Sequence, residues 1–152
     1  MFTWTYSEQI TTLATPEQIW AVWQDVASWP CWDRELEWVR LEGKFVVGAV
    51  GRMKPSGGPG VKFCLSEVVP LRAFSCVAKL PLTRLVFSHE YLSHQEGDGT
   101  AKIRHSVTMN GLLAPLFGRL TGRKIKKHLR LAMQELSLRA LTGDKTSVCQ
   151  PG

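Results

Sequence analysis

The sequence predicts a single α+β domain in which one long C-terminal helix packs on a curved antiparallel sheet. Apolar and polar side chains alternate along short segments from residue 35 to residue 110, and Gly- and Pro-containing turns separate these segments. A helical pattern then continues from Pro115 to Leu141 without a further proline. The 152 residues suit one core. We expect residues 1–143 to form the domain and residues 144–152 to form a flexible tail.

The first elements are a strand and two short helical segments. Residues Phe2 to Thr12 alternate large and polar side chains, which predicts a half-buried strand. The run TPEQ at Thr15 predicts a helix start with Thr15 as the N-cap, because Gln18 is placed to complete a capping box. Pro30 interrupts the pattern that follows, which predicts a second short helix or a turn.

Six further strands and one long helix complete the expected order. The strands are predicted near 35–42, 47–54, 61–69, 72–79, 83–94 and 101–110. Their short connections leave no room for parallel crossovers, so the sheet should be antiparallel. On the long helix, one arc of about 100° faces the sheet and contains Gly118, Gly122, Ile125, Leu129, Ala132, Met133, Leu136 and Ala140. The two glycines indicate either room for a ligand or close packing of the helix.

Composition and motifs limit the class of protein. Apolar residues make up 44% and charged residues 21% of the chain, as in globular proteins. No apolar run is long enough to span a bilayer and the N-terminus lacks a signal-peptide pattern, so we expect a cytoplasmic protein. Cys31, Cys64, Cys76 and Cys149 are expected to be free thiols, because their spacing fits no metal site. Common hydrolase, metalloprotease and nucleotide-binding motifs are absent from the sequence.

The formal charge of +6 is concentrated in the long helix, at Arg119, Arg123, Lys124, Lys126, Lys127 and Arg130. A solvated face explains such a cluster, and an anionic membrane surface or a nucleic acid would be alternative partners. Nucleic-acid binders usually add stacking aromatic residues, and Phe117 alone is available on this segment. We therefore expect no nucleic-acid partner and no integral membrane segment, with transient contact to an anionic membrane surface as the remaining option.

The last two strands contain the strongest chemical signal. Their odd-numbered residues are mainly apolar and include His89 and His105, so both histidines should point inward. A turn near Gly97 would place the two histidines opposite each other, with Cβ atoms about 5 Å apart. Such a pair could be structural, bind the polar end of a ligand, or transfer protons. Glu90 has the opposite parity and should point outward.

Two local motifs resemble a known family. The segment from Ala14 to Trp20 (ATPEQIW) is similar to "A-x-P-E-x-V-W", and the segment from Asp25 to Trp32 (DVASWPCW) is similar to "D-x-x-x-W-P-x-W". Both patterns are typical of the polyketide cyclase/dehydrase branch of the SRPBCC, or START-like, superfamily. The resemblance covers nearly the whole chain and implies the helix-grip fold, a seven-stranded curved antiparallel sheet wrapped around a long C-terminal helix. It specifies the fold better than the reaction, because the superfamily includes lipid carriers, hormone receptors and aromatase/cyclases.

We therefore expect the chain to bind or carry a small hydrophobic ligand, such as a lipid, a quinone or a polyketide-like aromatic, between sheet and helix. The expected ligand-binding residues are His89, His105, Tyr91, Phe87, Phe63, Met53, Trp32, Ile125, Leu129 and Met133. The alternative is a polyketide cyclase or dehydratase in which a histidine acts as the acid/base group and Tyr91 or Arg52 polarises a carbonyl. No cofactor or metal is expected, and the chain should be a monomer or a homodimer.

Overall fold

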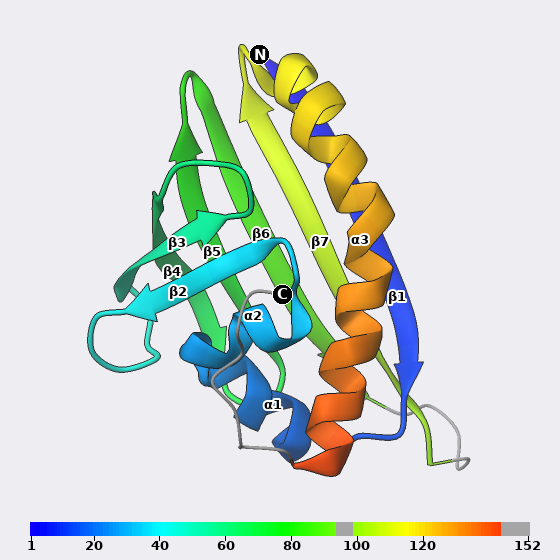
Figure 1. The fold of residues 1–152 in the computed structure, drawn as a ribbon. Helices are drawn as coiled ribbons and strands as arrows, with labels where there is room; N and C mark the ends of the chain where they lie inside the picture. Colours follow the sequence, from blue (N-terminus) through cyan, green and yellow to red (C-terminus); the bar gives the residue numbers. More distant parts are fainter. Residues whose placement is uncertain (94–98, 144–152) are drawn as a thin grey trace.

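The computed structural model describes residues 1–93 and 99–143, which form seven strands and the helices that cover them (Figure 1). In chain order the elements are β1 (Phe2–Thr12), α1 (Pro16–Gln24), a 3-10 turn η1 (Val26–Ser28), α2 (Trp29–Trp32), β2 (Leu36–Leu41), β3 (Val50–Pro55), β4 (Val61–Val69), β5 (Ala73–Leu80), β6 (Thr83–Leu92), β7 (Ala101–Gly111) and α3 (Ala114–Thr142). The turn expected near Gly97 and the expected tail after residue 143 lie outside the described residues.

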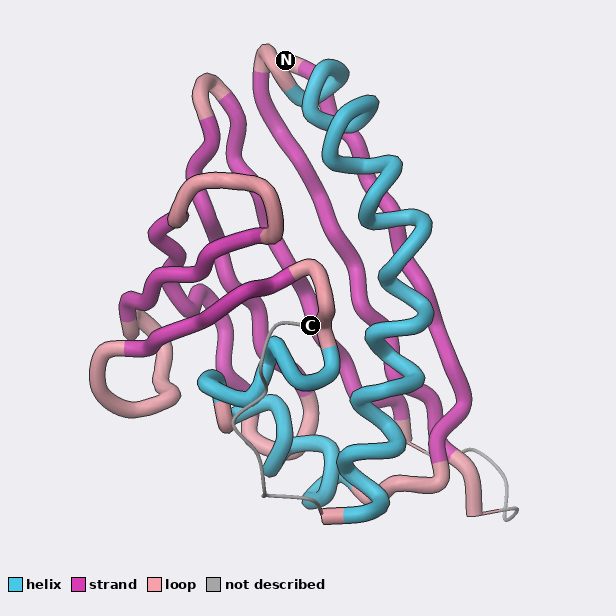
Figure 2. The backbone as a smooth tube through the Cα atoms, in the orientation of Figure 1, coloured by secondary structure: helices cyan, strands magenta, loops and turns pink. Residues whose placement is uncertain are grey.

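The strands form one sheet in the order β1-β7-β6-β5-β4-β3-β2, and every neighbouring pair is antiparallel. α3 lies along the β1 and β7 side of this sheet (Figures 1 and 2). The short helices α1 and α2 lie near the C-terminal half of α3, at one end of the sheet. The predicted α+β architecture, with two short helices after strand one, is confirmed.

The N-terminus of α1 has the predicted capping box. The Thr15 hydroxyl accepts a hydrogen bond from the Gln18 backbone N–H at 3.2 Å, and the Gln18 side chain accepts one from the Thr15 backbone N–H at 2.9 Å. These two bonds satisfy donors that a helix start leaves unpaired. Pro30 lies in the first turn of α2, where a helix tolerates the missing N–H.

Two glycines let α3 approach β1 closely. A Cβ atom at Gly118 would lie 2.6 Å from Cδ1 of Trp4, and one at Gly122 would lie 2.6 Å from Cζ2 of the same ring. The Trp4 indole therefore fills the space that side chains at these positions would need. Close helix packing explains both glycines, and the alternative of room for a ligand at these positions is wrong.

Replacing Gly122 with alanine should destabilise the protein by about 1–3 kcal/mol, because the added methyl group overlaps the Trp4 ring. Gly58→Ala is the matched control, since a Cβ there would meet its nearest atom at 3.8 Å. Urea denaturation measures both changes. Alanine favours a helix by about 1 kcal/mol over glycine, so a Gly122→Ala protein more stable than wild type would contradict this packing.

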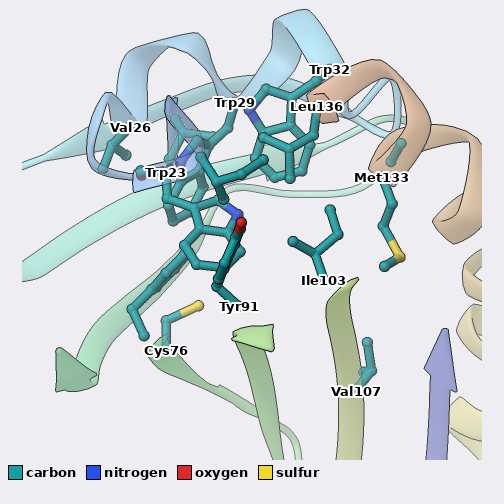
Figure 3. Packing of buried hydrophobic residues seen from close by; sticks show 14 of the residues in the cluster. Trp23, Val26, Trp29, Trp32, Cys76, Tyr91, Ile103, Val107, Met133 and Leu136 are labelled. Carbon is teal, nitrogen blue, oxygen red and sulfur yellow. Dashed lines mark hydrogen bonds between the residues drawn. The ribbon is translucent and has the colours of Figure 1, made fainter. Parts of the chain in front are cut away.

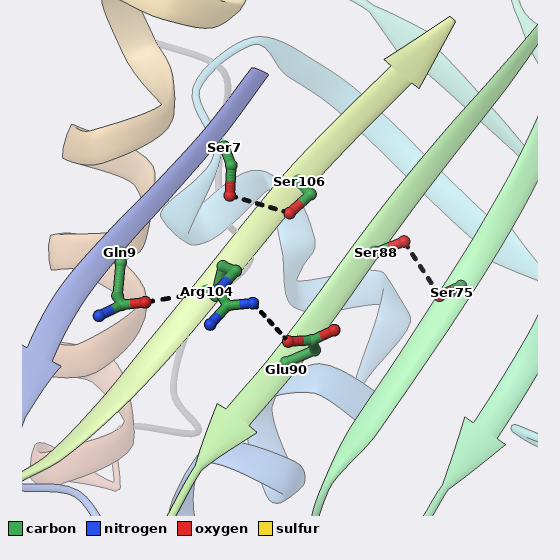
Figure 4. A network of polar contacts seen from close by, with 7 residues as sticks. All are labelled: Ser7, Gln9, Ser75, Ser88, Glu90, Arg104 and Ser106. Atoms are coloured by element: carbon green, nitrogen blue, oxygen red, sulfur yellow. Dashed lines mark hydrogen bonds and ion pairs between the residues drawn. The ribbon is translucent and has the colours of Figure 1, made fainter. Parts of the chain in front are cut away.

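The two faces of the sheet differ in polarity. On the outer face, Arg104 contacts Glu90 at 3.4 Å and donates a hydrogen bond to Gln9 at 3.4 Å (Figure 4). The Ser7 and Ser106 hydroxyls are 3.0 Å apart on the same face. On the inner face, the apolar core includes Trp23, Trp29, Trp32, Tyr91, Ile103, Met133 and Leu136 (Figure 3). The alternation predicted from the sequence therefore sets the orientation of the sheet.

Cysteine chemistry differs in part from the expectation. Cys64 and Cys76 are free thiols, as predicted. Cys31 is disulfide-bonded, so the expectation of a free thiol is wrong for this residue. Cys149 lies outside the described residues.

None of the helices in residues 1–93 and 99–143 is both long and apolar enough to span a membrane.

Candidate functional site

His89 on β6 and His105 on β7 meet on the inner face of the sheet. The two residues are direct partners across the antiparallel pair, which confirms the predicted register. Their ring centroids lie 4.5 Å apart at an interplanar angle of 73°. Both side chains are buried, with exposed fractions of 9% for His89 and 3% for His105. The hairpin thus places two imidazoles in contact within an apolar interior.

Aromatic rings enclose the histidine pair. Phe74, the partner of His89 on β5, stacks on the His89 ring at 4.0 Å between centroids and 4° between planes. Trp23 of α1 lies 6.0 Å from His89 and 5.9 Å from His105. Trp32 of α2 lies 6.0 Å from His105. The short helices therefore cover the pair from the side opposite the sheet.

The hydrogen bonds of this cluster are incomplete. His89 Nδ1 lies 3.3 Å from the Phe74 carbonyl oxygen, and Trp29 Nε1 donates to the Trp23 carbonyl oxygen at 2.9 Å. In contrast, His105 Nε2, Trp23 Nε1 and Trp32 Nε1 are buried and have no hydrogen-bond partner among the described residues. Buried polar atoms are rarely left unpaired. Trp23 and Trp32 both pack against His105, so the three unpaired polar atoms belong to one group of neighbouring rings inside the core.

Both imidazoles should be neutral at physiological pH. Burial lowers the pKa of His89 to about 3. Burial, together with the positive charge of a protonated His89, holds the pKa of His105 well below its ordinary value of 6.5. A neutral imidazole donates one hydrogen bond and accepts another. The pair is therefore suited to contact an uncharged polar group, such as a hydroxyl or a carbonyl.

Groups that could make the pair catalytic point elsewhere. Glu90 lies on the outer face beside Arg104, as its parity predicted. Arg52, one of the two residues that the cyclase hypothesis offered to polarise a carbonyl, alternates with the buried Met53 on β3 and is exposed. The Tyr91 hydroxyl donates a hydrogen bond to the Ala14 carbonyl oxygen at 2.8 Å. Within residues 1–93 and 99–143, neither buried histidine forms an ion pair.

The remaining expected ligand-binding residues separate into two groups. Phe63, Met53, Trp32 and Met133 are buried in the core. Phe87, Ile125 and Leu129 are only partly buried, although they belong to the inward-facing positions of β6 and α3. Trp29 and Trp32, which flank Pro30, are likewise buried.

Sequence analysis missed Trp23 and Phe74 as neighbours of the histidine pair. Trp23 lies at helical spacing from Ile19 and Trp20, which indicated a core residue and gave no sign of its contacts. Phe74 shares the inward parity of Cys76 on β5, so the pairing of β5 with β6 could have identified it.

The described part of the chain contains no group of three or more side chains suited to hold a metal ion.

Solved structures show the same fold. Norcoclaurine synthase from Thalictrum flavum, in complex with dopamine and hydroxybenzaldehyde, aligns with a TM-score of 0.70 at 14% identity over 95% of this chain and 90% of that chain. Ara h 8.0201 aligns with a TM-score of 0.66 at 14% identity, over 93% of this chain and 99% of that chain. Identities this low support a shared fold only.

Sequence comparisons identify the family. None of the curated proteins matches this chain significantly. The family model described as "Polyketide cyclase / dehydrase and lipid transport" matches residues 3–143, which include every described helix and strand except the first residue of β1. The resemblance inferred from the two N-terminal motifs is thereby confirmed. The chain belongs to the polyketide cyclase/dehydrase and lipid transport family of the SRPBCC, or START-like, superfamily.

Proposed function

We propose that the chain binds a small, largely apolar molecule between the inner face of its sheet and α3. The observation that carries this proposal is the partial exposure of apolar side chains that face the interior. Phe87 lies between Leu85 and His89 at inward positions of β6, and both of these neighbours are buried while Phe87 is not. Solvent therefore reaches the inner face of the sheet at this point.

α3 has the same feature on the facing layer. Ile125 and Leu129 follow the buried Gly122 and precede the buried Met133 on one arc of the helix, yet both remain partly exposed. Apolar side chains at inward positions are normally covered in a closed core. Their incomplete burial on both layers supports a space that an apolar ligand would fill.

The histidine cluster supports a polar anchor for this ligand. His105 Nε2 and the indole N–H groups of Trp23 and Trp32 have no partner among the described residues. The depressed histidine pKa values favour an uncharged ligand group over a carboxylate. The solved norcoclaurine synthase structure contains dopamine and hydroxybenzaldehyde, so hydroxylated aromatics are reasonable first probes.

Native mass spectrometry of protein purified without denaturant tests the proposal, because a retained ligand appears as added mass. Titration with 4-hydroxybenzaldehyde, followed by Trp fluorescence, tests a defined probe. Leu129→Trp should weaken retention or probe binding by at least about tenfold by filling the interior, a loss equal to 1.4 kcal/mol. Leu131→Trp is the matched control, since Leu131 is 50% exposed on the outer side of the same helix.

Two results would contradict the binding proposal. One is equal binding by the Leu129→Trp and Leu131→Trp proteins, which would place the ligand elsewhere. The other is turnover of a polyketide-like substrate by the wild type that disappears in His89→Phe/His105→Leu protein while binding persists. That outcome would make the histidines catalytic and would favour the cyclase or dehydratase alternative.

A further inference from the structure

We propose that one end of the molecule docks on the surface of an anionic lipid bilayer. This end, which we call the leucine end, presents five large apolar side chains to solvent. Their exposed fractions are 54% for Phe2, 68% for Leu82, 61% for Leu112, 48% for Leu116 and 62% for Leu120. Apolar side chains gathered on a surface indicate a binding site more often than chance exposure does.

Strand pairing and a hydrogen bond bring the backbones of Phe2, Leu82 and Leu112 together. Phe2 and Thr83 are both register partners of Gly111. The Leu112 N–H donates to the Leu82 carbonyl oxygen at 3.0 Å. α3 begins at Ala114, and Leu116 and Leu120 lie one turn apart near its start, on the side of the helix opposite Gly118 and Gly122 and therefore away from Trp4. Figure 1 shows the β5–β6 turn, the β7–α3 connection and the start of α3 at the same end.

Leu82 lies in a strained turn at this end of the sheet. Leu82 has a φ angle of 51°, in the left-handed region that glycine and asparagine occupy more easily than leucine. A leucine here costs conformational energy and places a 68% exposed apolar side chain at the tip of the β5–β6 turn. Leu71 in the β4–β5 turn, at the other end of the sheet, has a similar φ angle of 67° and is 40% exposed, so it is the greater exposure of Leu82 that contributes to the leucine end.

The charge around the leucine end is entirely positive. Residues 1–7, 79–88 and 106–127 make up this half of the sheet and α3, and they contain no Asp or Glu. They contain the cations Lys79, Arg84, Arg119, Arg123, Lys124, Lys126 and Lys127. Arg119 and Arg123 flank the exposed Leu120 along α3 and are themselves exposed. Cationic and apolar side chains therefore alternate on one surface.

An anionic bilayer matches both properties at once. Its headgroups attract the arginines and lysines, and its acyl boundary accepts the leucines. A second copy of the chain fits less well, because a two-fold contact would bring the same cations together. Nucleic acid would satisfy the cations and leave the leucines in water. This surface is separate from the proposed ligand site, so it can be tested without any ligand.

Vesicle co-sedimentation tests the proposal with the full chain. Wild-type protein should sediment with vesicles of 70% POPC and 30% POPS, remain soluble with POPC alone, and lose binding between 0.1 M and 0.5 M NaCl. Arg119→Glu/Arg123→Glu should reduce POPS binding by more than roughly fivefold, the effect of about one cation. Arg72→Glu/Lys102→Glu makes the same charge change at exposed positions on the opposite end of the sheet. This control should bind the POPS vesicles more tightly than Arg119→Glu/Arg123→Glu does.

The apolar contribution is tested separately. Leu116→Gln/Leu120→Gln should reduce POPS binding at least about tenfold, since membrane affinity scales with buried apolar area. Val46→Gln/Val47→Gln is the control, because these valines are 52% and 61% exposed in the β2–β3 connection, away from α3 (Figure 1). Circular dichroism checks that each variant is folded.

Several outcomes would overturn the proposal. Wild-type protein that stays in the supernatant with POPS vesicles would do so, as would full binding by the folded Leu116→Gln/Leu120→Gln protein. A wild-type dimer that this same variant converts to a monomer, without vesicle binding, would assign the leucine end to self-association. Preferential binding to a DNA or RNA duplex that the leucine variant retains would assign the cations to nucleic acid.

Discussion

Urea should unfold the protein at much lower concentrations at pH 4.5 than at pH 6.5. In the folded state, burial lowers the pKa of His89 to about 3 and holds that of His105 well below 6.5. In the unfolded state both side chains take up protons near pH 6.5. The unfolded state therefore binds more protons below pH 6.5, so the free energy of unfolding falls as the pH falls, down to about pH 3 for His89.

The expected loss is large relative to total stability. His89 contributes about 1.4 kcal/mol per pH unit, or nearly 3 kcal/mol over two units, and His105 adds a loss of the same sign. Asp33 acts in the opposite direction, because burial raises its folded-state pKa from 3.8 to about 6. That carboxyl adds stability as the pH falls below 6, by about 2 kcal/mol at pH 4.5. The loss from His89 alone exceeds this gain and His105 adds to the loss, so the free energy of unfolding still falls, from a total that is usually about 5–15 kcal/mol.

Equilibrium urea unfolding at several pH values checks this prediction. His89→Phe/His105→Leu should remain folded at pH 7.5. Its free energy of unfolding should no longer fall with the pH through histidine protonation, because neither replacement side chain titrates. His128→Gln is the control, since His128 lies near the surface beside Glu35 and outside the buried pair. If the double variant kept the wild-type dependence on pH, the buried histidines would not be its source.

Leu136→Ala should destabilise the protein by about 2–5 kcal/mol, which is the usual cost of truncating a fully buried leucine. Leu136 is 0% exposed on the inward arc of α3. Leu129 shares the inward arc that the helical spacing of the sequence identifies. Because Leu129 is only partly buried, Leu129→Ala should cost clearly less than Leu136→Ala.

Arg123→Ala is the control for these two changes, because Arg123 is exposed on another face of α3 and a surface substitution usually changes stability by less than about 0.5 kcal/mol. Thermal and urea denaturation at pH 7.5 compare the three variants with wild type. Equal losses for Leu129→Ala and Leu136→Ala would show that the interior near Leu129 is closed. That result would also remove the main support for a ligand between α3 and the sheet.

Local patterns were sufficient to predict the elements of the fold. Every predicted strand is present, and the helix predicted from 115 to 141 extends from Ala114 to Thr142. These predictions succeeded because period-two alternation and helical spacing are properties of neighbouring residues. The facing of His89 and His105 was also predictable, since parity and a short connection between their strands fix a small set of registers.

Depth of burial and distant contacts were not predictable in the same way. Helical spacing identifies the inward face of α3, but it does not distinguish the buried Leu136 from the partly exposed Leu129. The glycines of α3 fit against Trp4, a residue more than 100 positions away in the chain. The break at Pro30 predicted a short helix or a turn but not its depth, and the structure buries Trp29 and Trp32 on either side of it.

The pairing of β1 with β7 also constrains the order in which the chain can fold. It joins Phe2 to Gly111 and Thr12 to Ala101, so β1 has no strand partner until most of the chain has been synthesised. The β4–β5–β6 meander, in contrast, consists of strands that are adjacent in sequence. Closing a loop of this length before any contact compensates for its entropy slows folding. We therefore expect the meander to form early, and β1 to join β7 late, with the docking of α3 on Trp4 completing the structure.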